Sequence, residues 1–485
     1  MLKGHHGGRY RPLTDSDIEQ IHQTVLRVFK EVGVQVNHDE ALEIFKNNGA
    51  KVDVNSRIVK FEEAMIMDLI KQAPKRVTLC GREPDGSLDL EIGGTRVYLG
   101  TGGTVLNVQD PGCDDNRRSE LKDIMNMARM VNELENIHFY MLNIFPNDIE
   151  REDIDVNRFG AALNRTKKHI MGGVYTVEGI RNVIKMATMI AGSKEALKAR
   201  PFISMVACII SPFKLDEDYG RLAIEVAKNN IPLVVPAEPL CGATAPITLA
   251  GNLVVDCVDT LTGVMLAQLI NPGTPALFGC ISSITDLRDM KYLAGAVEMG
   301  LLNAAASQMA QFYELPIYAT AGMSDSKVND AQSGYESALT NLMVALAGGN
   351  FIHDAAGFLE FCLTASFDKL VIDNEIIGMV MRAVEGIKVD ETTLAFDEIQ
   401  KVGPAGHFVS SRHTRRHMRN EQFMPRLSDR ENREVWQISG GKDARQRATE
   451  TARRILANEP VSHINDDVRR RIINEIPGIY NFLME

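Results

Sequence analysis

Short apolar runs alternate with longer segments of helical period along the chain from about residue 96. Runs rich in Val, Ile, Phe and Tyr, bounded by turn residues, are typical of buried strands. Eight such runs occur, at 97–105, 137–145, 169–176, 202–211, 231–240, 275–283, 315–323 and 351–358. Helical segments lie between and after them, at 119–134, 176–192, 216–230, 247–271, 290–313, 330–347 and about 372–386.

Eight strand-then-helix units predict an α/β fold, a (β/α)8 (TIM) barrel. A doubly wound open sheet is the alternative, but no G-x-G-x-x-G fingerprint follows the first strand. Residues 1–95 have a mainly helical pattern, at 12–31, 38–48 and 61–72, and the pattern beyond residue 388 is helical again. We therefore expect a catalytic barrel at 96–387, with helical extensions at 1–95 and 388–485 packed onto it.

Ligands of such a barrel bind where the strands end, so the candidate site residues lie at the carboxyl ends of the eight runs. Aromatic residues make up only 6% of the chain, yet Tyr98, Tyr175, Tyr318 and Phe358 fall near these ends. Aromatic faces attract quaternary ammonium groups by about 0.5–2 kcal/mol each, which makes the four residues candidates for substrate binding. Packing in the top layer of the barrel is the alternative role for each.

Two ionisable positions lie at the same ends. Glu238 stands between two prolines, and the run "NFIHDAAGFLEF" at 350–361 contains His353 and Asp354. A carboxylate there binds a cation or takes a proton. We expect His353 to face the pocket, while Asp354 fixes its tautomer. Glu238 and His353 are thus the candidate catalytic residues; a solvated turn carboxylate and a capping Asp354 are the plainer alternatives.

Small residues gather at the strand ends, as "GTGG" at 100–103, "GG" at 172–173 and "AAG" at 355–357. They predict a wide mouth, in which Gly102 and Gly173 give clearance to a large cofactor. Ordinary turn chemistry is the alternative explanation. No set of His, Cys or carboxylate residues has metal-ligand spacing, so no metal site is predicted.

Composition indicates which kinds of partner the protein has and where in the cell it is found. The 53 basic and 64 acidic residues give a net charge of −11, which argues against nucleic acid as the main partner. Seven scattered cysteines without a C-x-x-C pair, and no signal-peptide pattern, predict a reducing cytoplasm. The apolar stretch 247–270 contains Asp256 and Asp259, so we interpret it as a buried helix and expect no membrane partner. We also expect a homo-oligomer.

Three long stretches carry a resemblance to a known family. They are "DLRDMKYLAGAVEMGLLNAAASQMAQFYELP" (286–316), "SDSKVNDAQSGYES" (324–337) and "GHFVSSRHTRRHMRNEQFMPRLSDRENREVW" (406–436). In these, and over essentially its whole length including "VFKEVGVQV" (28–36), the chain resembles the trimethylamine methyltransferase (MttB) superfamily. Members are (β/α)8 barrels that pass a methyl group from a methylated amine to the Co(I) of a corrinoid protein.

The founding enzyme of that superfamily uses pyrrolysine, whereas this chain shows only the twenty usual residues. It therefore resembles the non-pyrrolysine branch, whose members demethylate quaternary amines such as glycine betaine, proline betaine, carnitine and γ-butyrobetaine. The resemblance implies a betaine-type N-demethylase that leaves a tertiary amine. We expect His353 to hydrogen-bond the carboxylate of such a substrate. A quaternary nitrogen already carries its charge, so orientation of the methyl carbon in line with cobalt suffices.

The resemblance also implies that the corrinoid (cobalamin) is supplied by a cognate corrinoid protein and not bound by this chain, which lacks a D-x-H-x-x-G-type motif. Two alternatives stay open: a barrel lyase or hydrolase with Glu238 or His353 as general base, and a betaine-binding protein without catalysis. The Arg- and His-rich segment 407–433 has two interpretations as well. It either clamps the C-terminal extension onto the acidic barrel or forms a docking rim for the corrinoid protein.

Overall fold

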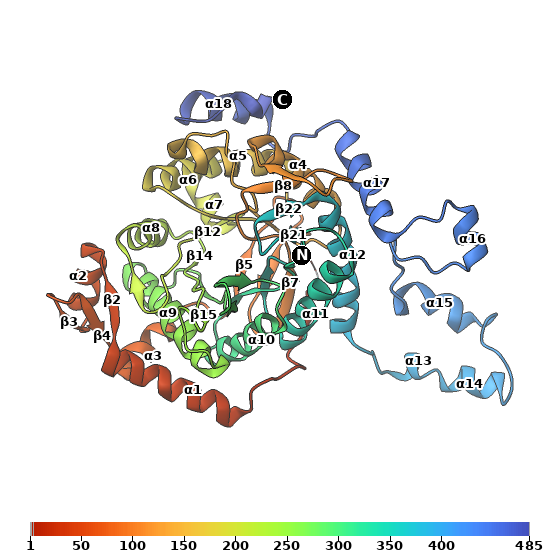
Figure 1. Ribbon diagram of the computed structural model, residues 1–485, viewed down its shortest axis with the longest axis horizontal. Helices are drawn as coiled ribbons and strands as arrows, with labels where there is room; N and C mark the ends of the chain where they lie inside the picture. The colour runs from red at the N-terminus through yellow and green to blue at the C-terminus, as the bar shows by residue number, and fades with distance from the viewer. Residues whose placement is uncertain (1, 3, 485) are drawn as a thin grey trace.

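A parallel barrel of eight strands forms the centre of the molecule in the computed structural model, which describes residues 2 and 4–484 (Figure 1). The strands are β7 (Arg96–Leu99), β10 (Tyr140–Met141), β11 (Ile170–Gly173), β12 (Ile203–Val206), β14 (Leu233–Val234), β16 (Ala276–Gly279), β19 (Ile317–Thr320) and β20 (Phe351–His353). Strand β20 pairs with β7, and the barrel closes between β7 and β10, where the His138 N–H donates to the Leu99 carbonyl oxygen at 2.9 Å. Every strand lies at a predicted run.

One major helix follows each barrel strand and packs on the outside of the barrel. These helices are α4 (Leu121–Glu133), α5 (Ile154–Arg165), α6 (Val177–Ala191), α8 (Glu217–Lys228), α9 (Leu249–Ile270), α10 (Val297–Phe312), α11 (Ala331–Ala347) and α12 (Phe367–Glu385). The short α7 (Lys194–Ala199) precedes β12, and the 3-10 turn η2 (Arg151–Asp153) precedes α5. The (β/α)8 prediction is confirmed. The sequence pattern missed α5, because all twelve of its residues are buried and several, such as Asp155 and Arg158, are charged.

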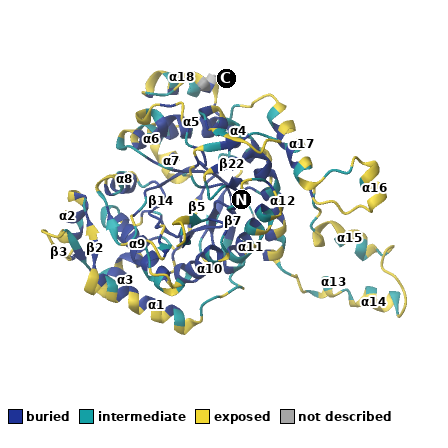
Figure 2. Cartoon of the chain, viewed as in Figure 1, coloured by how far each residue is buried: buried dark blue, intermediate teal, exposed yellow. Residues whose placement is uncertain are grey.

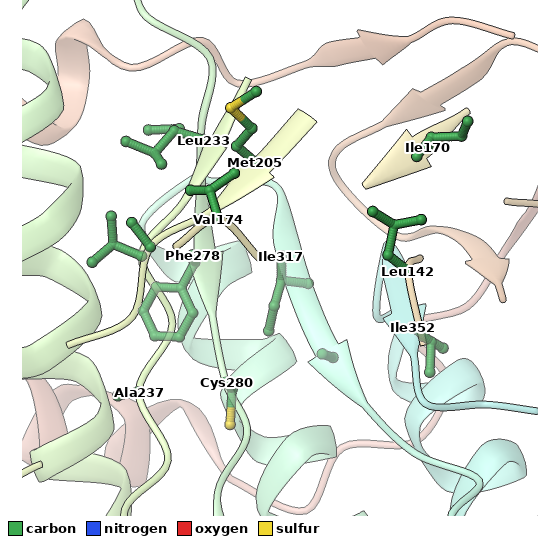
Figure 3. Close-up of a cluster of buried hydrophobic side chains, with 14 of the residues drawn as sticks. Leu142, Ile170, Val174, Met205, Leu233, Ala237, Phe278, Cys280, Ile317 and Ile352 are labelled. Carbon is green, nitrogen blue, oxygen red and sulfur yellow. The ribbon is translucent and has the colours of Figure 1, made fainter. Parts of the chain in front are cut away.

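Alternation along each strand divides the core into two parts. One set of side chains, including Tyr98, Met171, Leu277 and Phe351, fills the inside of the barrel. The other set points outward against the helices. Figure 3 shows part of this outer set: Leu142, Ile170, Met205, Leu233, Phe278, Ile317 and Ile352 are among its labelled members.

The N-terminal segment closes the amino end of the barrel and covers one side. Strand β1 (His5–His6) pairs with β7, and the hairpin of β5 (Val77–Leu79) and β6 (Leu90–Ile92) packs its apolar side chains against the inner cluster. Helices α1 (Asp15–Arg27), α2 (Asp39–Asn47) and α3 (Glu63–Gln72) lie against α9, and the π-helical turn η1 (Val28–Val32) extends α1. Strands β2 (Val34–Val36), β3 (Lys51–Asp53) and β4 (Ile58–Lys60) form a small sheet with β13 (Lys214–Leu215).

Helix α9 is long and apolar enough to cross a membrane by composition alone, but 83% of its most apolar window is buried inside the protein. Asn252, Asp256, Asp259 and Gln268 are buried with it. The interpretation of 247–270 as a buried helix is therefore confirmed.

Two further small sheets are built from the loops that follow barrel strands. Strands β8 (Asn107–Gln109), β9 (Asn116–Arg118), β21 (Phe358–Leu359) and β22 (Thr364–Ser366) form one. Strands β15 (Leu240–Cys241), β17 (Ser283–Asp286) and β18 (Lys291–Leu293) form the other. Because these loops leave the carboxyl ends of the barrel strands, both sheets lie at the end of the barrel where the site is expected.

The C-terminal region packs on the barrel through α17 (Ala444–Ala457), against α12 and α4, and through α18 (Asp466–Glu475), against α6; the 3-10 turn η3 (Asn481–Met484) ends it. Between them and the barrel, residues 387–441 project outward in Figure 1 and are mostly exposed in Figure 2. This segment, called the arm below, contains α13 (Glu391–Leu394), α14 (Phe396–Val402), α15 (Arg412–Glu421) and α16 (Arg433–Ile438). The expectation that the whole extension packs onto the barrel is wrong for the arm.

The basic segment 407–433 lies within the arm and is tied to the barrel near its end. Glu375 on α12 accepts hydrogen bonds from the backbone N–H groups of Arg426, Leu427 and Ser428. Arg426 also pairs with Glu135 at 2.9 Å. At the end of α15, the Glu421 carboxylate pairs with Arg382 on α12 at 3.8 Å, and the Arg382 guanidinium donates to the Glu421 carbonyl oxygen. The clamp is therefore a feature of residues 421–428, whereas the arginines of α15 form no ion pair to the barrel among the described residues.

Candidate functional site

A cavity of about 360 Å³ lies at the carboxyl end of the barrel, and every barrel strand contributes to it. Its wall takes residues from the last positions of each strand or from the loop that follows. They are Gly103 and Thr104 after β7, Met141, Gly173, Val206, Glu238 after β14, Ile281 after β16, Tyr318 and His353. A cavity that all eight strands share lies on the barrel axis, at the position where this fold binds its ligands.

His353 and Asp354 form a hydrogen-bonded pair in the cavity wall. His353 Nε2 lies 3.0 Å from Asp354 Oδ2, and Nδ1 lies 2.7 Å from the Ala319 carbonyl oxygen. The carbonyl oxygen only accepts, so Nδ1 carries a hydrogen and Nε2 shares one with the carboxyl group. Asp354 Oδ1 is buried and has no hydrogen-bond partner among the described residues.

The tautomer of His353 is thus set by two partners, Asp354 and the Ala319 carbonyl. The Thr320 hydroxyl is also close to His353, with its oxygen 3.1 Å from Nε2, and it donates to the Cys280 carbonyl oxygen. With both nitrogens engaged, His353 has no free N–H for a substrate carboxylate. The predicted hydrogen bond to a substrate therefore lacks a donor in this arrangement.

Tyr318 and Tyr175 line the cavity from β19 and from the turn after β11. The Tyr318 ring stacks on the His353 ring with centroids 3.8 Å apart. Tyr175 is held by Asp155, whose carboxylate accepts its backbone N–H at 3.1 Å, and by the Arg158 guanidinium, 5.5 Å from its ring centroid. Arg158 itself is buried behind the wall and donates to the carbonyl oxygens of Ile144, Leu142 and Gly173.

Glu238 projects into the cavity from the loop after β14, where it is accessible from the cavity but surrounded by protein. Desolvation, together with the nearby charge of Asp354, raises the pKa of Glu238 to about 7. The carboxyl group is therefore divided between its neutral and anionic forms at physiological pH. An approaching cation would favour the anionic form.

Three aromatic residues of the wall escaped sequence prediction: Tyr219, Tyr292 and Phe361. Tyr219 is in the first turn of α8 and Tyr292 is on β18, so neither lies at the end of a barrel strand. The residue pattern gives no signal that these elements fold back over the mouth. Tyr292 does fall in one of the stretches that carry the family resemblance.

Phe361 is placed by a turn in which Glu360, Phe361 and Cys362 have φ values of 55°, 59° and 64°. Left-handed backbone costs a non-glycine residue roughly 1–2 kcal/mol. The Glu360 and Phe361 N–H groups donate to Ser326 and Ser324, which holds the turn in place. Strain of this kind concentrates at functional sites, and here it positions an aromatic ring and a thiol at the cavity.

Two of the predicted substrate-binding residues lie elsewhere. Tyr98 is inside the barrel near its amino end, where its hydroxyl donates to the Leu2 carbonyl oxygen at 3.3 Å. Phe358 is fully buried in the outer core, behind Gly103. Both were predicted to lie at the mouth because they are near strand ends in the sequence. Tyr98 points into the barrel but one layer below the mouth, and Phe358 points outward, so both pack in the core.

The two glycines predicted to give clearance differ in role. A side chain at Gly173 would meet no atom within 4 Å of its Cβ, so this position borders open space in the cavity. A Cβ at Gly102 would lie 2.3 Å from the backbone nitrogen of Asp354. Gly102 is therefore required for the close passage of two chain segments, and the prediction that it makes room for a cofactor is wrong.

The cavity offers acids and aromatic faces without a reactive nucleophile. Burial and the charge of Glu238 raise the pKa of the Cys208 thiol to about 12, and burial raises that of Cys362 as well, so both thiols are protonated at neutral pH. No Lys or Arg is among the described residues that line it. The described chain also contains no cluster of three His, Cys, Asp or Glu residues able to hold a metal ion.

Comparison with known proteins shows the family of the chain. A trimethylamine methyltransferase (MTTB) model matches residues 4–476. A trimethylamine methyltransferase MttB of Desulfitobacterium hafniense is 36% identical over 96% of this chain and 94% of its own length. A glycine betaine methyltransferase of the same species is 31% identical over 93% of each chain.

A crystal structure of the Methanosarcina barkeri monomethylamine methyltransferase (MtmB) has the same fold. Its TM-score is 0.54 at 12% identity, and the match covers 93% of this chain and 88% of that one. The family model spans nearly the whole sequence, and relatives above 30% identity extend over more than nine-tenths of it. The chain belongs to the trimethylamine methyltransferase (MTTB) family.

Proposed function

We propose that this protein is a quaternary amine N-demethylase of betaine type, which transfers a methyl group to the Co(I) of a cognate corrinoid protein. The observation that carries the proposal is the cavity itself. Glu238 and Asp354 supply negative charge, and Tyr175, Tyr318 and other rings supply aromatic faces. Each such face attracts a quaternary ammonium group by about 0.5–2 kcal/mol, so the wall suits a methylated cation.

The reaction balances without help from an acid, a base or a covalent nucleophile on this chain. The C–N bond breaks and its electron pair stays on nitrogen, so a neutral tertiary amine leaves. Co(I) supplies two electrons to the methyl carbon and becomes methyl-Co(III). The protonated thiols and the engaged nitrogens of His353 fit a wall that binds the cation without attacking it. The contribution of the enzyme is then orientation of one methyl carbon toward the mouth.

The substituent of the ammonium group lies away from the two acids and beside the axis of the methyl group that faces the mouth in this proposal. A betaine carboxylate finds no cationic side chain among the described lining residues, and two acids would repel it at the inner wall. The ammonium nitrogen therefore lies near the two acids with one methyl carbon directed to the mouth, and the carboxylate stays hydrated beside that axis. The glycine betaine methyltransferase among the relatives supports a substrate of this class.

Membership of a methyltransferase family supports transfer over the two alternatives, a lyase or hydrolase and a binding protein. The open space at Gly173 supports access of a corrinoid ring from the mouth. We propose in addition that the corrinoid protein supplies the cobalamin and that the reaction takes place in the cytoplasm.

The proposal is tested by absorbance spectroscopy of the cognate corrinoid protein, whose gene is sought next to the gene of this chain. Added enzyme and a quaternary amine should convert the Co(I) spectrum to that of methyl-Co(III), and the tertiary amine should appear in equal amount. No conversion with any of glycine betaine, proline betaine, carnitine or γ-butyrobetaine would overturn it.

A further inference from the structure

The arm, residues 387–441, has almost no core of its own. Leu427 is its one buried residue, and helices α13 to α16 contain none. Large apolar side chains are instead exposed along it, Phe396 at 68% and Ile438 at 87% among them. Figure 2 shows the arm in the exposed colour along most of its length.

Helices as short as these do not hold their structure in water without a surface to pack on. The four helices of the arm have 4, 7, 10 and 6 residues. The hydrogen bond of His413 Nε2 with the Thr392 carbonyl oxygen connects two helices of the arm, and Glu421 and residues 426–428 tie it to α12. Short helices with exposed apolar side chains therefore indicate a covering surface outside the arm's own contacts.

A second unpartnered surface lies on the barrel wall. Helix α11 exposes Ala331, Tyr335 and Leu339, and leaves Met343 partly exposed, at a spacing of four residues; these define the α11 face. Tyr335 is 61% exposed and Leu339 46%. The one charged residue of α11, Glu336, is engaged with Ser324, Gln332 and the Asp325 N–H. An outer helix face is normally polar, so an apolar one marks an interface.

Another apolar helix of the barrel wall, α9, is covered by a terminal segment of the chain. Helix α9 is shielded by α1, α2 and α3 from the N-terminal segment. On α11, the segment at Arg9 and Tyr10 reaches only the last turn, where both N–H groups donate to the Leu346 carbonyl oxygen. The arm leaves the barrel at the adjacent helix α12 and extends away from its own α11 in Figure 1.

We infer that the arm of one copy covers the α11 face of a second copy, and the reverse, in a twofold dimer. Both surfaces expose large apolar side chains, both belong to the same chain, and they are present in equal number. A reciprocal exchange of arms closes the assembly, because each copy offers one arm and one face. The exposed apolar side chains of the arm would lie at the centre of such an interface and its arginines at the rim.

A corrinoid protein is the other possible occupant, and the position of the α11 face argues against it. Methyl transfer requires a partner at the mouth, whereas the α11 face runs along the side wall of the barrel. The exposed arginines of α15, Arg412, Arg415, Arg416 and Arg419, form no ion pair within the described chain. They suit the rim of an interface on a chain whose net charge is −11.

Sedimentation velocity on the full-length protein at low micromolar concentration tests the inference. The wild type should sediment at twice its 53.7 kDa or as a multiple of that dimer. Leu339→Glu on the face and Phe396→Glu on the arm should each raise the dissociation constant of the dimer at least about 30-fold, as loss of an interface hot spot does. Val54→Glu, at a residue 59% exposed outside both surfaces, is the matched control and should stay dimeric.

Mixing the two defective proteins tests which surfaces meet. A Leu339→Glu copy keeps an intact arm and a Phe396→Glu copy keeps an intact face, so the mixture should form a heterodimer through one contact. A monomeric wild type, or dimers unaffected by both substitutions, would overturn the inference. Absence of the heterodimer would overturn the pairing of arm with face. Circular dichroism shows whether each variant is folded. If Leu339→Glu is misfolded, Tyr335→Glu replaces it on the face; if Phe396→Glu is misfolded, Ile399→Glu replaces it on the arm.

Discussion

Glu238 is the residue whose titration the site depends on most. Its pKa of about 7 arises from desolvation and from the charge of Asp354. A bound quaternary ammonium would favour the carboxylate. Such a cation keeps its charge at every pH, so a change in its binding affinity near pH 7 reports the titration of a group on the protein.

Affinity for a quaternary amine should therefore rise as pH increases through about 7, since Glu238 is neutral below this value and anionic above it. Glu238→Gln should remove this step and weaken binding about tenfold at pH 8, the effect of one partly screened ion pair. Isothermal titration calorimetry measures both, and proton release on binding near pH 7 gives a second readout. Glu195→Gln, on an exposed position of α7, should change neither. A step that persists in Glu238→Gln would assign the titration to another group.

His353 illustrates how a residue predicted to lie at the site can have a different role there. The sequence indicated that it faces a pocket beside Asp354, and its position in the cavity wall agrees. Its partners could not be foreseen, because the Ala319 carbonyl comes from the neighbouring strand. That contact leaves no N–H for a substrate carboxylate.

A betaine and the matching alcohol, in which a hydroxymethyl group replaces the carboxylate, should therefore be demethylated with kcat/KM values within about tenfold of each other. A site built around a substrate group rejects an analogue that lacks it by about 10⁴-fold or more. Steady-state rates of methyl transfer with the two donors measure the ratio. An alcohol that reacts more than a hundredfold slower would indicate an undetected carboxylate site.

At the scale of elements, the two glycines give a matched pair of substitutions. Gly102→Ala places a Cβ 2.3 Å from the Asp354 nitrogen, so the free energy of unfolding should fall by about 1–3 kcal/mol. Gly173→Leu extends into open cavity space, so stability should stay within about 1 kcal/mol while methyl transfer is lost. Denaturant unfolding and transfer assays on both variants separate the two effects. A stable Gly102→Ala protein, or an active Gly173→Leu protein, would contradict the roles assigned to these glycines.

The regular elements of the barrel were predictable because each obeys a local rule. Its strands are apolar runs buried on both sides, and seven of the eight outer helices lie in segments that the sequence predicts to be helical. Helix α5 breaks the rule: it is buried all round and carries Asp155 and Arg158 for contacts that involve Tyr175, 20 and 17 positions away along the chain. The left-handed turn at 360–362 gives no local signal either, since its residues are not glycine.

At the scale of the whole molecule, the sequence located the mouth but not what lies over it. Tyr175, Tyr318, Glu238 and His353 follow from strand ends on a common axis. Tyr219 and Tyr292 come from a helix and a loop strand that return over the cavity, and such long-range packing has no local pattern. The arm could be predicted as helical, but its projection from the barrel depends on a surface that its own chain does not provide.

The central claim is that a methyl group leaves a quaternary nitrogen held in this cavity and passes directly to cobalt. The most direct measurement uses a quaternary amine with three deuterated N-methyl groups, the enzyme and a Co(I)-corrinoid protein, with mass spectrometry of both products. We predict one CD₃ group on the corrinoid for each tertiary amine that retains two, and no transfer with Gly173→Leu. A corrinoid without label, or a tertiary amine formed in the absence of corrinoid protein, would contradict the account.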